Sequence, residues 1–263
     1  MRPVIAFLTD FGTQDHYAGT MKGVVLGICP DATLVDITHD IPPHDVTAGA
    51  LELAAAYKYF PAGTIFVVVV DPGVGSARRG VAAETADYRF VAPDNGVLTA
   101  VLRETPAKKI VELTERRYAR PTVSRTFEGR DRFAPAAAWL GKGIQLAALG
   151  RPVSEIHRLE MPVAELSGDT VRGVIIRVDR FGNLVTNIDR KLVERVGQVG
   201  AITIDAGGKA IDRLVATYAE LPADGVGALF GSTDHLELAA PSASAADRLG
   251  LSRGAVVTVA RRG

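Results

Sequence analysis

The chain has 263 residues, of which 47% are hydrophobic and 23% charged, the balance of an ordinary globular protein with a sizeable core. Lys plus Arg and Asp plus Glu each number 30, so bulk charge favours neither nucleic acid nor a membrane surface as a partner. The single Cys29 excludes a disulfide framework and a cysteine-based zinc cluster, and it favours a cytoplasmic protein.

The first 160 residues alternate short apolar runs with Ala-rich segments. The N-terminal run is short and ends in a polar turn, which predicts a buried strand rather than a signal peptide or membrane span. The run TIFVVVVD is nearly all β-branched, as is typical of a central parallel strand. The alternation predicts an α/β domain with a doubly wound, mostly parallel sheet. Strands are expected at 3–10, 33–38, 64–71, 81–85, 88–93 and 109–114, and helices at 18–28, 46–60, 97–104 and 134–149.

After Pro162 the pattern changes to short strands separated by Gly, Asp and Ser turns, without intervening helices. Such a pattern predicts an all-β, barrel-like C-terminal domain. The segment VAELSGDT, residues 163–170, is expected to be a linker, which gives domains at 1–163 and 168–263. The strands are expected at 171–179, 182–188, 200–208, 209–215, 227–232, 235–241 and 255–261.

Polar clusters follow three strands of the predicted α/β sheet. LTDFGTQD contains Asp10 and Asp15, DPGVGSARR contains Asp71 and Arg78, and APDNG contains Asn95. Each cluster alone also fits an ordinary turn, since Asp, Asn, Gly and Pro are the usual turn residues. Ligands bind at the carboxyl ends of strands in such sheets, so three clusters at one edge favour a binding site.

The chemistry of these clusters is open at this level. DPGVGS lacks the GxxxxGK[ST] pattern, so a phosphate loop is weakly supported. Asp10, Asp15 and Asp71 are able to ligate a hard cation, which leaves a metal-dependent hydrolase as one alternative. The five histidines show no HExxH spacing, so no zinc site is predicted and no residue is assigned as a metal ligand.

A further cluster, VDRFGNLVTNI, lies in the predicted β domain. Asp179 and Asn183 flank Phe181, and an amide beside an aromatic ring suits recognition of a base such as adenine. The alternative is a β-hairpin whose FGN turn needs small polar residues.

In order along the chain, the motifs LTDFGTQDHYAGTMKG, DITHDIPPHDV, VVVDPGVGS, APDNGVLT, TFEGRDRFAPAAAWL, VDRFGNLVTNI and GSTDHLELA resemble the SAM hydroxide adenosyltransferase family, relatives of the SAM-dependent fluorinase and chlorinase. The resemblance runs from about residue 4 to residue 260. It implies attack of water or hydroxide on the ribose C5′ of S-adenosyl-L-methionine (SAM), giving adenosine and L-methionine without a cofactor. It also implies a homotrimer, with SAM between the N-terminal domain of one subunit and the C-terminal domain of its neighbour.

The resemblance also implies residue roles. Asp71 and Arg78 match two members of an Asp–Arg–His set that positions water. By the resemblance, Asp10 contacts the ribose hydroxyls, and Asn183 contacts adenine. Asp15 and Asp179 lie near the methionine ammonium, and Ser232 lies near the methionine carboxylate. Further implied substrate-binding residues are Asn95, Gly129 and Phe181.

The chain departs from the family motif TFHGRD, because Glu128 stands in the position of the histidine. An unpaired carboxylate about 4 Å from hydroxide would repel it by roughly 4 kcal/mol at an effective dielectric near 20. That repulsion equals about a thousandfold in rate. We therefore expect Glu128 to pair with Arg78 and help place the water, to act as the base, or to be held protonated by burial.

Three other functions stay open at the level of sequence. Gly129 is expected to leave space for an anion, so a SAM-dependent chloride adenosyltransferase is one alternative. The others are a SAM- or adenosine-binding protein that lost activity through Glu128, and the metal-dependent hydrolase.

Overall fold

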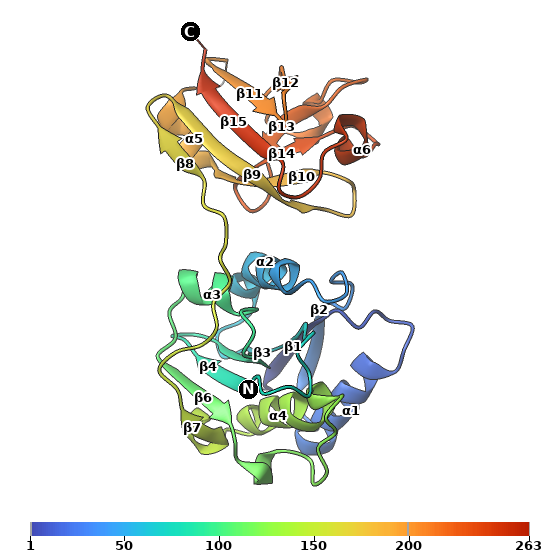
Figure 1. The fold of residues 1–263 in the computed structure, drawn as a ribbon. Helices are drawn as coiled ribbons and strands as arrows, with labels where there is room; N and C mark the ends of the chain where they lie inside the picture. The colour runs from blue at the N-terminus through green and yellow to red at the C-terminus, as the bar shows by residue number, and fades with distance from the viewer. Residues whose placement is uncertain (1, 199, 263) are drawn as a thin grey trace. The chain divides into compact units, whose positions relative to one another are not determined.

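The computed structural model describes residues 2–198 and 200–262, and the chain divides into two compact units between Leu159 and Glu160 (Figure 1). The outer ends of the predicted domains, residues 1 and 263, lie outside the described residues. The segment 163–170, expected to be a linker, instead contains strand β8 (Glu165–Ser167), which pairs with β9. Backbone pairing therefore extends the second unit into this segment.

The sheet of the first unit has the strand order β2-β1-β3-β5-β4-β6-β7. Strands β2, β1, β3 and β5 run parallel, whereas β4, β6 and β7 are joined by antiparallel pairings. The α/β class is confirmed, but the sheet is mixed, because β4 returns from β3 through a loop with no crossover helix. The strands are β1 (Val4–Thr9), β2 (Thr33–Thr38), β3 (Ile65–Val69), β4 (Gly80–Glu84), β5 (Arg89–Pro93), β6 (Lys109–Leu113) and β7 (Gly150–Pro152).

Helices cover both faces of this sheet, as a doubly wound layer requires (Figure 1). Ile5 and Phe7 of β1 pack with α1 (Tyr17–Ile28) and α4 (Ala134–Gly141). The alternate residues, Ala6 and Leu8, pack on the other face with α2 (Val46–Ala56) and α3 (Thr99–Glu104). Alternation of side chains along a strand therefore builds the two cores from one apolar run.

Two helices are shorter than their Ala-rich runs predict. The run at 46–60 is α-helical to Ala56 and continues as the 3-10 turn Tyr57–Tyr59. The run at 134–149 is helical to Gly141, then turns at Gly143 with φ 90° before the 3-10 turn Leu146–Leu149. Glycine adopts this left-handed backbone without steric cost, which ends the helix.

The second unit is an antiparallel sheet along the path β12-β11-β15-β9-β10-β14-β13, with β8 beside β9. This confirms the all-β, barrel-like prediction. Two short helices were not expected: α5 (Arg190–Val196), capped by the Asp189 carboxylate, and α6 (Ala245–Leu249), capped by the Ser244 hydroxyl. The strands are β9 (Thr170–Val178), β10 (Leu184–Asp189), β11 (Ile202–Ala206), β12 (Lys209–Ile211), β13 (Gly227–Phe230), β14 (His235–Ala239) and β15 (Val256–Arg261).

The parallel strands of the first unit end at one edge of the sheet. Asp10 follows β1, Asp71 lies two residues after β3, and Asp94 follows β5. Because β4 is antiparallel, its first residue also lies at this edge, directly after Arg78 and Arg79. The mixed topology thus brings acids and arginines together. None of the described helices combines the length and apolar character needed to cross a membrane.

Candidate active site

A cavity of about 300 Å³ lies at this edge of the first unit. It brings together four of the residues predicted from sequence, whereas Arg78, Asp15 and Asn95 do not line it. Arg78 lies behind the lining, in contact with Asp71 and Glu128. The lining residues are Asp10, Phe11, Tyr17, Pro43, His44, Val69, Asp71, Val74, Thr126, Phe127, Glu128 and Gly129.

Asp71 and Arg78 form a two-pronged ion pair in the loop between β3 and β4. Arg78 Nε donates to Asp71 Oδ1 at 2.9 Å, and Arg78 Nη2 donates to Asp71 Oδ2. The Ser76 hydroxyl folds the loop by donating to the Gly73 carbonyl at 2.7 Å and accepting the Arg78 N–H at 3.2 Å. The side chains of Asp71 and Arg78 are only 5% and 10% exposed, so the ion pair is largely removed from water.

Glu128 joins this pair, as one of the sequence-based hypotheses expected. Arg78 Nη2 lies 2.7 Å from Glu128 Oε2, and Arg132 Nε lies 3.5 Å from Glu128 Oε1. A π-helical turn, Gly129–Phe133, follows Glu128, and the Ala134 N–H bonds the Gly129 carbonyl five residues back. Glu128 is therefore paired through both carboxylate oxygens, and its side chain is 14% exposed.

The arginine at the centre of this network stays charged. Burial by itself would lower the pKa of the Arg78 guanidinium, but hydrogen bonds and charge from Asp71 and Glu128 raise that pKa above its ordinary value. Its plane also lies over the Phe133 ring, 5.3 Å from the centroid. The remaining nitrogen, Arg78 Nη1, is buried and has no hydrogen-bond partner among the described residues. A buried donor of this kind suits a small acceptor such as water.

Asp10 is held in place by a residue that the sequence did not single out. The backbone N–H of His44 donates to Asp10 Oδ2 at 2.9 Å. His44 has φ 69°, a left-handed conformation that is uncommon for a residue other than glycine. It also lines the cavity. His44 lies in the motif DITHDIPPHDV of the resemblance, but its left-handed backbone conformation cannot be recognised from the sequence.

Three aromatic rings that line the cavity contact one another. Phe127 lies 5.2 Å from Tyr17 and 6.0 Å from Phe11 between ring centroids, and Phe11 lies 5.7 Å from Tyr17. The cavity therefore has an aromatic part beside its charged groups, the usual composition of a small-molecule site. All three lie within motifs of the resemblance, but the sequence-based prediction selected the charged and polar residues of those motifs and missed the rings.

The expectation that Gly129 leaves open space is wrong. The residue is buried, and a Cβ atom at this position would lie 3.0 Å from Met21 Sδ and 3.4 Å from Phe127 Cε2. The missing side chain therefore lets the π-helical turn pack against α1. Gly129 still lines the cavity, and its contact with substrate stays a prediction.

Asp15 and Asn95 do not line the cavity. Asp15 is exposed in the turn before α1. Asn95 Nδ2 donates to the Val70 carbonyl at 2.8 Å and Asn95 Oδ1 accepts the Val97 N–H at 3.2 Å, so the side chain ties the loop after β5 to the end of β3. Contact of either residue with substrate stays a prediction.

The predicted residues of the second unit gather around Asp179. Its Oδ1 accepts the N–H groups of Phe181 and Asn183, each at 2.9 Å, and its Oδ2 accepts Asn183 Nδ2 at 2.9 Å. Asn183 is buried, whereas the Phe181 ring is 78% exposed. Ser232 lies exposed in the turn between β13 and β14. The hairpin interpretation thus accounts for the local fold, and the exposed ring leaves a face for stacking.

The acids and histidines do not form a metal centre in the part of the chain that the structure describes, since no three His, Cys, Asp or Glu side chains are grouped to hold an ion. Asp10 and Asp71 share the cavity, while Asp15 does not line it.

Two family models match the chain: the N-terminal domain of SAM hydroxide adenosyltransferase at residues 5–150 and its C-terminal domain at residues 173–258. The chain is 37% identical over 262 residues to an (R)-S-adenosyl-L-methionine hydrolase of Thermus thermophilus, covering 97% of this chain and 98% of the relative. It is 33% identical over 297 residues to a fluorinase of Actinoplanes sp., covering 98% of each. Its fold is similar to that of an uncharacterized conserved protein from Thermotoga maritima, with TM-score 0.92 and 34% identity over 98% of this chain and 100% of that one.

Proposed function

Because this chain belongs to the SAM hydroxide adenosyltransferase family, we propose that it cleaves S-adenosyl-L-methionine with water, giving adenosine and L-methionine. The observation that carries this proposal is the ion network of Asp71, Arg78, Glu128 and Arg132. It holds a charged guanidinium with one uncommitted buried donor beside a cavity that has an aromatic wall.

The reaction requires a positioned nucleophile more than an acid. Water attacks the ribose C5′ and forms the C5′–O bond while the C5′–S bond breaks. The electron pair of the broken C5′–S bond goes to sulfur, and methionine leaves as a neutral thioether. Neither a general acid nor a cofactor is therefore needed. The water must lie in line with the C5′–S bond and be separated from bulk water. Arg78 Nη1 would donate to that water, and a carboxylate of Asp71 or Glu128 would take the proton.

The ion network explains how a glutamate can occupy this position. The two carboxylates of Asp71 and Glu128 are matched by the two guanidinium groups of Arg78 and Arg132, so the network is neutral. The repulsion of roughly 4 kcal/mol expected from an unpaired carboxylate near hydroxide is thereby largely offset. Glu128 would act within this pairing, not as a free charge facing the nucleophile.

The remaining roles rest on the family. Asp10 would hold the ribose hydroxyls at the cavity, and Asp179, Asn183, Phe181 and Ser232 would contact methionine and adenine from the second unit. A homotrimer in which each site uses both units of neighbouring subunits accounts for this division, and closed symmetric assemblies are common. A cytoplasmic location agrees with the lone buried Cys29.

The test is to incubate purified protein with SAM, with and without chloride, and to separate the products chromatographically. We expect adenosine and methionine in equal amounts, independent of chloride and of EDTA. The similarity to a fluorinase makes halide transfer the second candidate, and 5′-chloro-5′-deoxyadenosine in the chloride arm would establish it. No nucleoside product in either arm would contradict both, and loss of activity in EDTA would point to the metal-dependent hydrolase.

The role of Glu128 is tested by Glu128→Gln and Glu128→His in the same assay. We expect a lower kcat for Glu128→Gln, because it breaks the pairing with Arg78 and Arg132. The matched control is Glu115→Gln, an exposed acid of the same segment that pairs with Arg117. Wild-type rates for both Glu128 variants would refute the role of this residue.

A further inference from the structure

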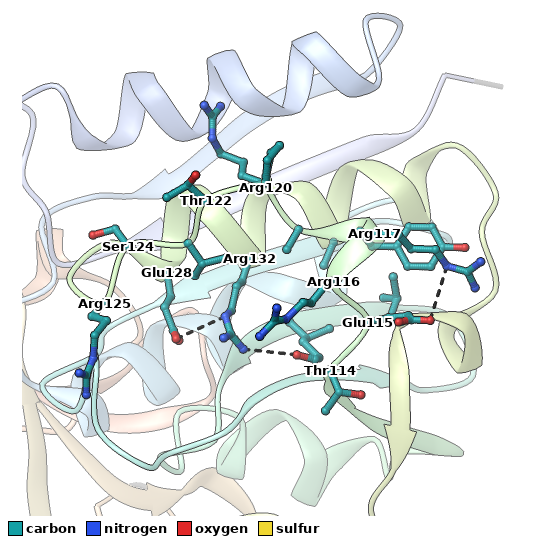
Figure 2. A pocket seen from close by; sticks show the side chains of 17 residues that line it. Thr114, Glu115, Arg116, Arg117, Arg120, Thr122, Ser124, Arg125, Glu128 and Arg132 are labelled. Carbon is teal, nitrogen blue, oxygen red and sulfur yellow. Dashed lines mark hydrogen bonds and ion pairs between the residues drawn. The ribbon is translucent and has the colours of Figure 1, made fainter.

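A second cavity, of about 710 Å³, shares Glu128 with the first, and apart from Glu128 and Arg132 its lining residues have no role in the proposed reaction. The segment between β6 and the π-helical turn forms most of its wall, and Figure 2 shows the side chains that line it. Five of the described arginines line this cavity, together with two acids, Glu115 and Glu128, and we call it the arginine cavity. The five are Arg116, Arg117, Arg120, Arg125 and Arg132.

The guanidinium groups of these arginines differ in the ion pairs and hydrogen bonds that they make with the rest of the protein. Arg117 lies 3.6 Å from Glu115 and Arg120 lies 3.4 Å from Asp131. Among the residues that the structure describes, the Arg125 guanidinium bonds only the Gly75 carbonyl, at 3.4 Å. The Arg116 guanidinium makes no hydrogen bond or ion pair with any of the described residues, and only the backbone carbonyl of this residue is used, by the Ala119 N–H at 3.1 Å. The cavity therefore contains guanidinium groups whose donors are not used by the fold.

Arg132 connects this cavity to the proposed active site. Its contacts are long: Nε lies 3.5 Å from Glu128 Oε1, and Nη1 lies 3.5 Å from the Leu113 carbonyl. Arg116 and Arg132 both line the cavity, and in the view of Figure 2 both appear between Glu128 and Thr114. Glu128 lines both cavities, so it is the wall that they share.

We propose that the arginine cavity binds a small oxyanion, a compound with phosphate or carboxylate groups, between Arg116 and Arg132. A guanidinium presents a planar fork of donors that matches phosphate and carboxylate oxygens, and such charge-assisted bonds are among the strong ones. The volume is that of a small-molecule site. A concave site lined by arginines favours such a ligand over an extended surface partner.

The bound anion also acts on Glu128, a consequence that rests on the proposed function. It competes for Arg132, whose side chain is 39% exposed and whose contact with Glu128 is long, at 3.5 Å. Glu128 then keeps only Arg78 as a counter-charge, and the negative charge beside the nucleophile increases. We expect the anion to lower kcat by up to about fivefold, the rate equivalent of a partly exposed ion pair.

Binding is tested on the full chain without SAM, by titrating inorganic phosphate and, separately, citrate at constant ionic strength. Tyr118 lines the cavity and lies 5.7 Å from Trp139 between ring centroids, so tryptophan fluorescence is a suitable signal beside calorimetry. We expect saturable binding of one anion class, weakened about tenfold or more in Arg116→Gln, as for the loss of a charge-assisted hydrogen bond. The matched control is Arg103→Gln, an exposed arginine at the end of α3 that does not line the cavity.

The outcomes separate this site from the proposed reaction. Saturable binding that Arg116→Gln weakens and Arg103→Gln does not would support the site even if SAM is not cleaved. Binding that is not saturable, or that is equal in wild type and Arg116→Gln, would overturn it. Where SAM is cleaved, Arg116→Gln should keep the basal rate and lose inhibition by the anion. Full inhibition in this variant would also overturn the proposal.

Discussion

Replacing Arg78 by Met gives the sharpest test of the charge network. The substitution keeps much of the side-chain volume but leaves Asp71 and Glu128, 5% and 14% exposed, without the guanidinium between them. Removing one partner of a buried ion pair typically costs about 3–5 kcal/mol of unfolding free energy. We expect Arg78→Met to lose an amount in this range at pH 7, together with most of the SAM cleavage.

In the variant no guanidinium lies between the carboxylates of Asp71 and Glu128, so their like charges repel each other. The double variant with Glu128→Gln should recover part of the loss at pH 7, because one of the two like charges is gone.

The assay is urea denaturation followed by fluorescence. Trp139 is the only tryptophan of the chain and lies in α4, so the signal reports the first unit. Arg79→Met is the control: Arg79 is 37% exposed, and its partner Asp94 keeps a hydrogen bond from the His157 N–H at 2.7 Å. An Arg78→Met loss that is no larger than that of Arg79→Met would refute the reasoning.

Two further predictions concern backbone geometry and the second unit. Gly75→Ala should cost at least about 2 kcal/mol in the same assay, because Gly75 has φ 79° and its Cβ would lie 2.4 Å from the Arg125 carbonyl oxygen. Gly143→Ala, with φ 90° but open space, should cost only about 1 kcal/mol, and equal losses would contradict the clash. Burial raises the pKa of Glu237; the hydrogen bond from Tyr218 at 2.5 Å opposes this rise, and the charge of Asp179 adds to it. A raised folded-state pKa gives stability that is full below the unfolded value near 4.5 and is lost at higher pH. The free energy of unfolding of Glu237→Gln should therefore rise relative to that of wild type from pH 4 to pH 8, measured by urea denaturation followed by circular dichroism. A difference that stays constant over this range would argue against it.

The parts of the fold that the sequence predicted are those with a strong local pattern. The β-branched run of β3 and the alternation of apolar and Ala-rich segments follow directly from side-chain periodicity. The direction of β4 does not, because VAAET looks alike in a parallel and an antiparallel strand. The direction is set by the pairing of β4 with β5 and β6, which both follow it in the chain.

The candidate site divides in the same way. Asp10, Asp71, Arg78 and Glu128 were predicted because charged residues at strand ends and in motifs are visible in the sequence. The role of Gly129 was misjudged, because an absent side chain indicates neither open space nor packing until the neighbouring helix is placed. Contacts set by backbone conformation, such as that of His44 with Asp10, also depend on the tertiary fold.

The π-helical turn Gly129–Phe133 has a consequence for how the enzyme can change. A π turn holds about one residue more than an α-helical turn, and it leads directly into α4, whose position is fixed by its packing against α1 and the sheet. That extra residue sets the angle at which the chain before it leaves the helix. Deleting one residue from the turn would rotate Glu128 by about 100° around the helix axis, while α4 and the core stay in place. The identity of the residue facing Arg78 is thus a matter of helical phase as well as of side-chain type, and a length change of one residue is a route to a different nucleophile environment on the same fold.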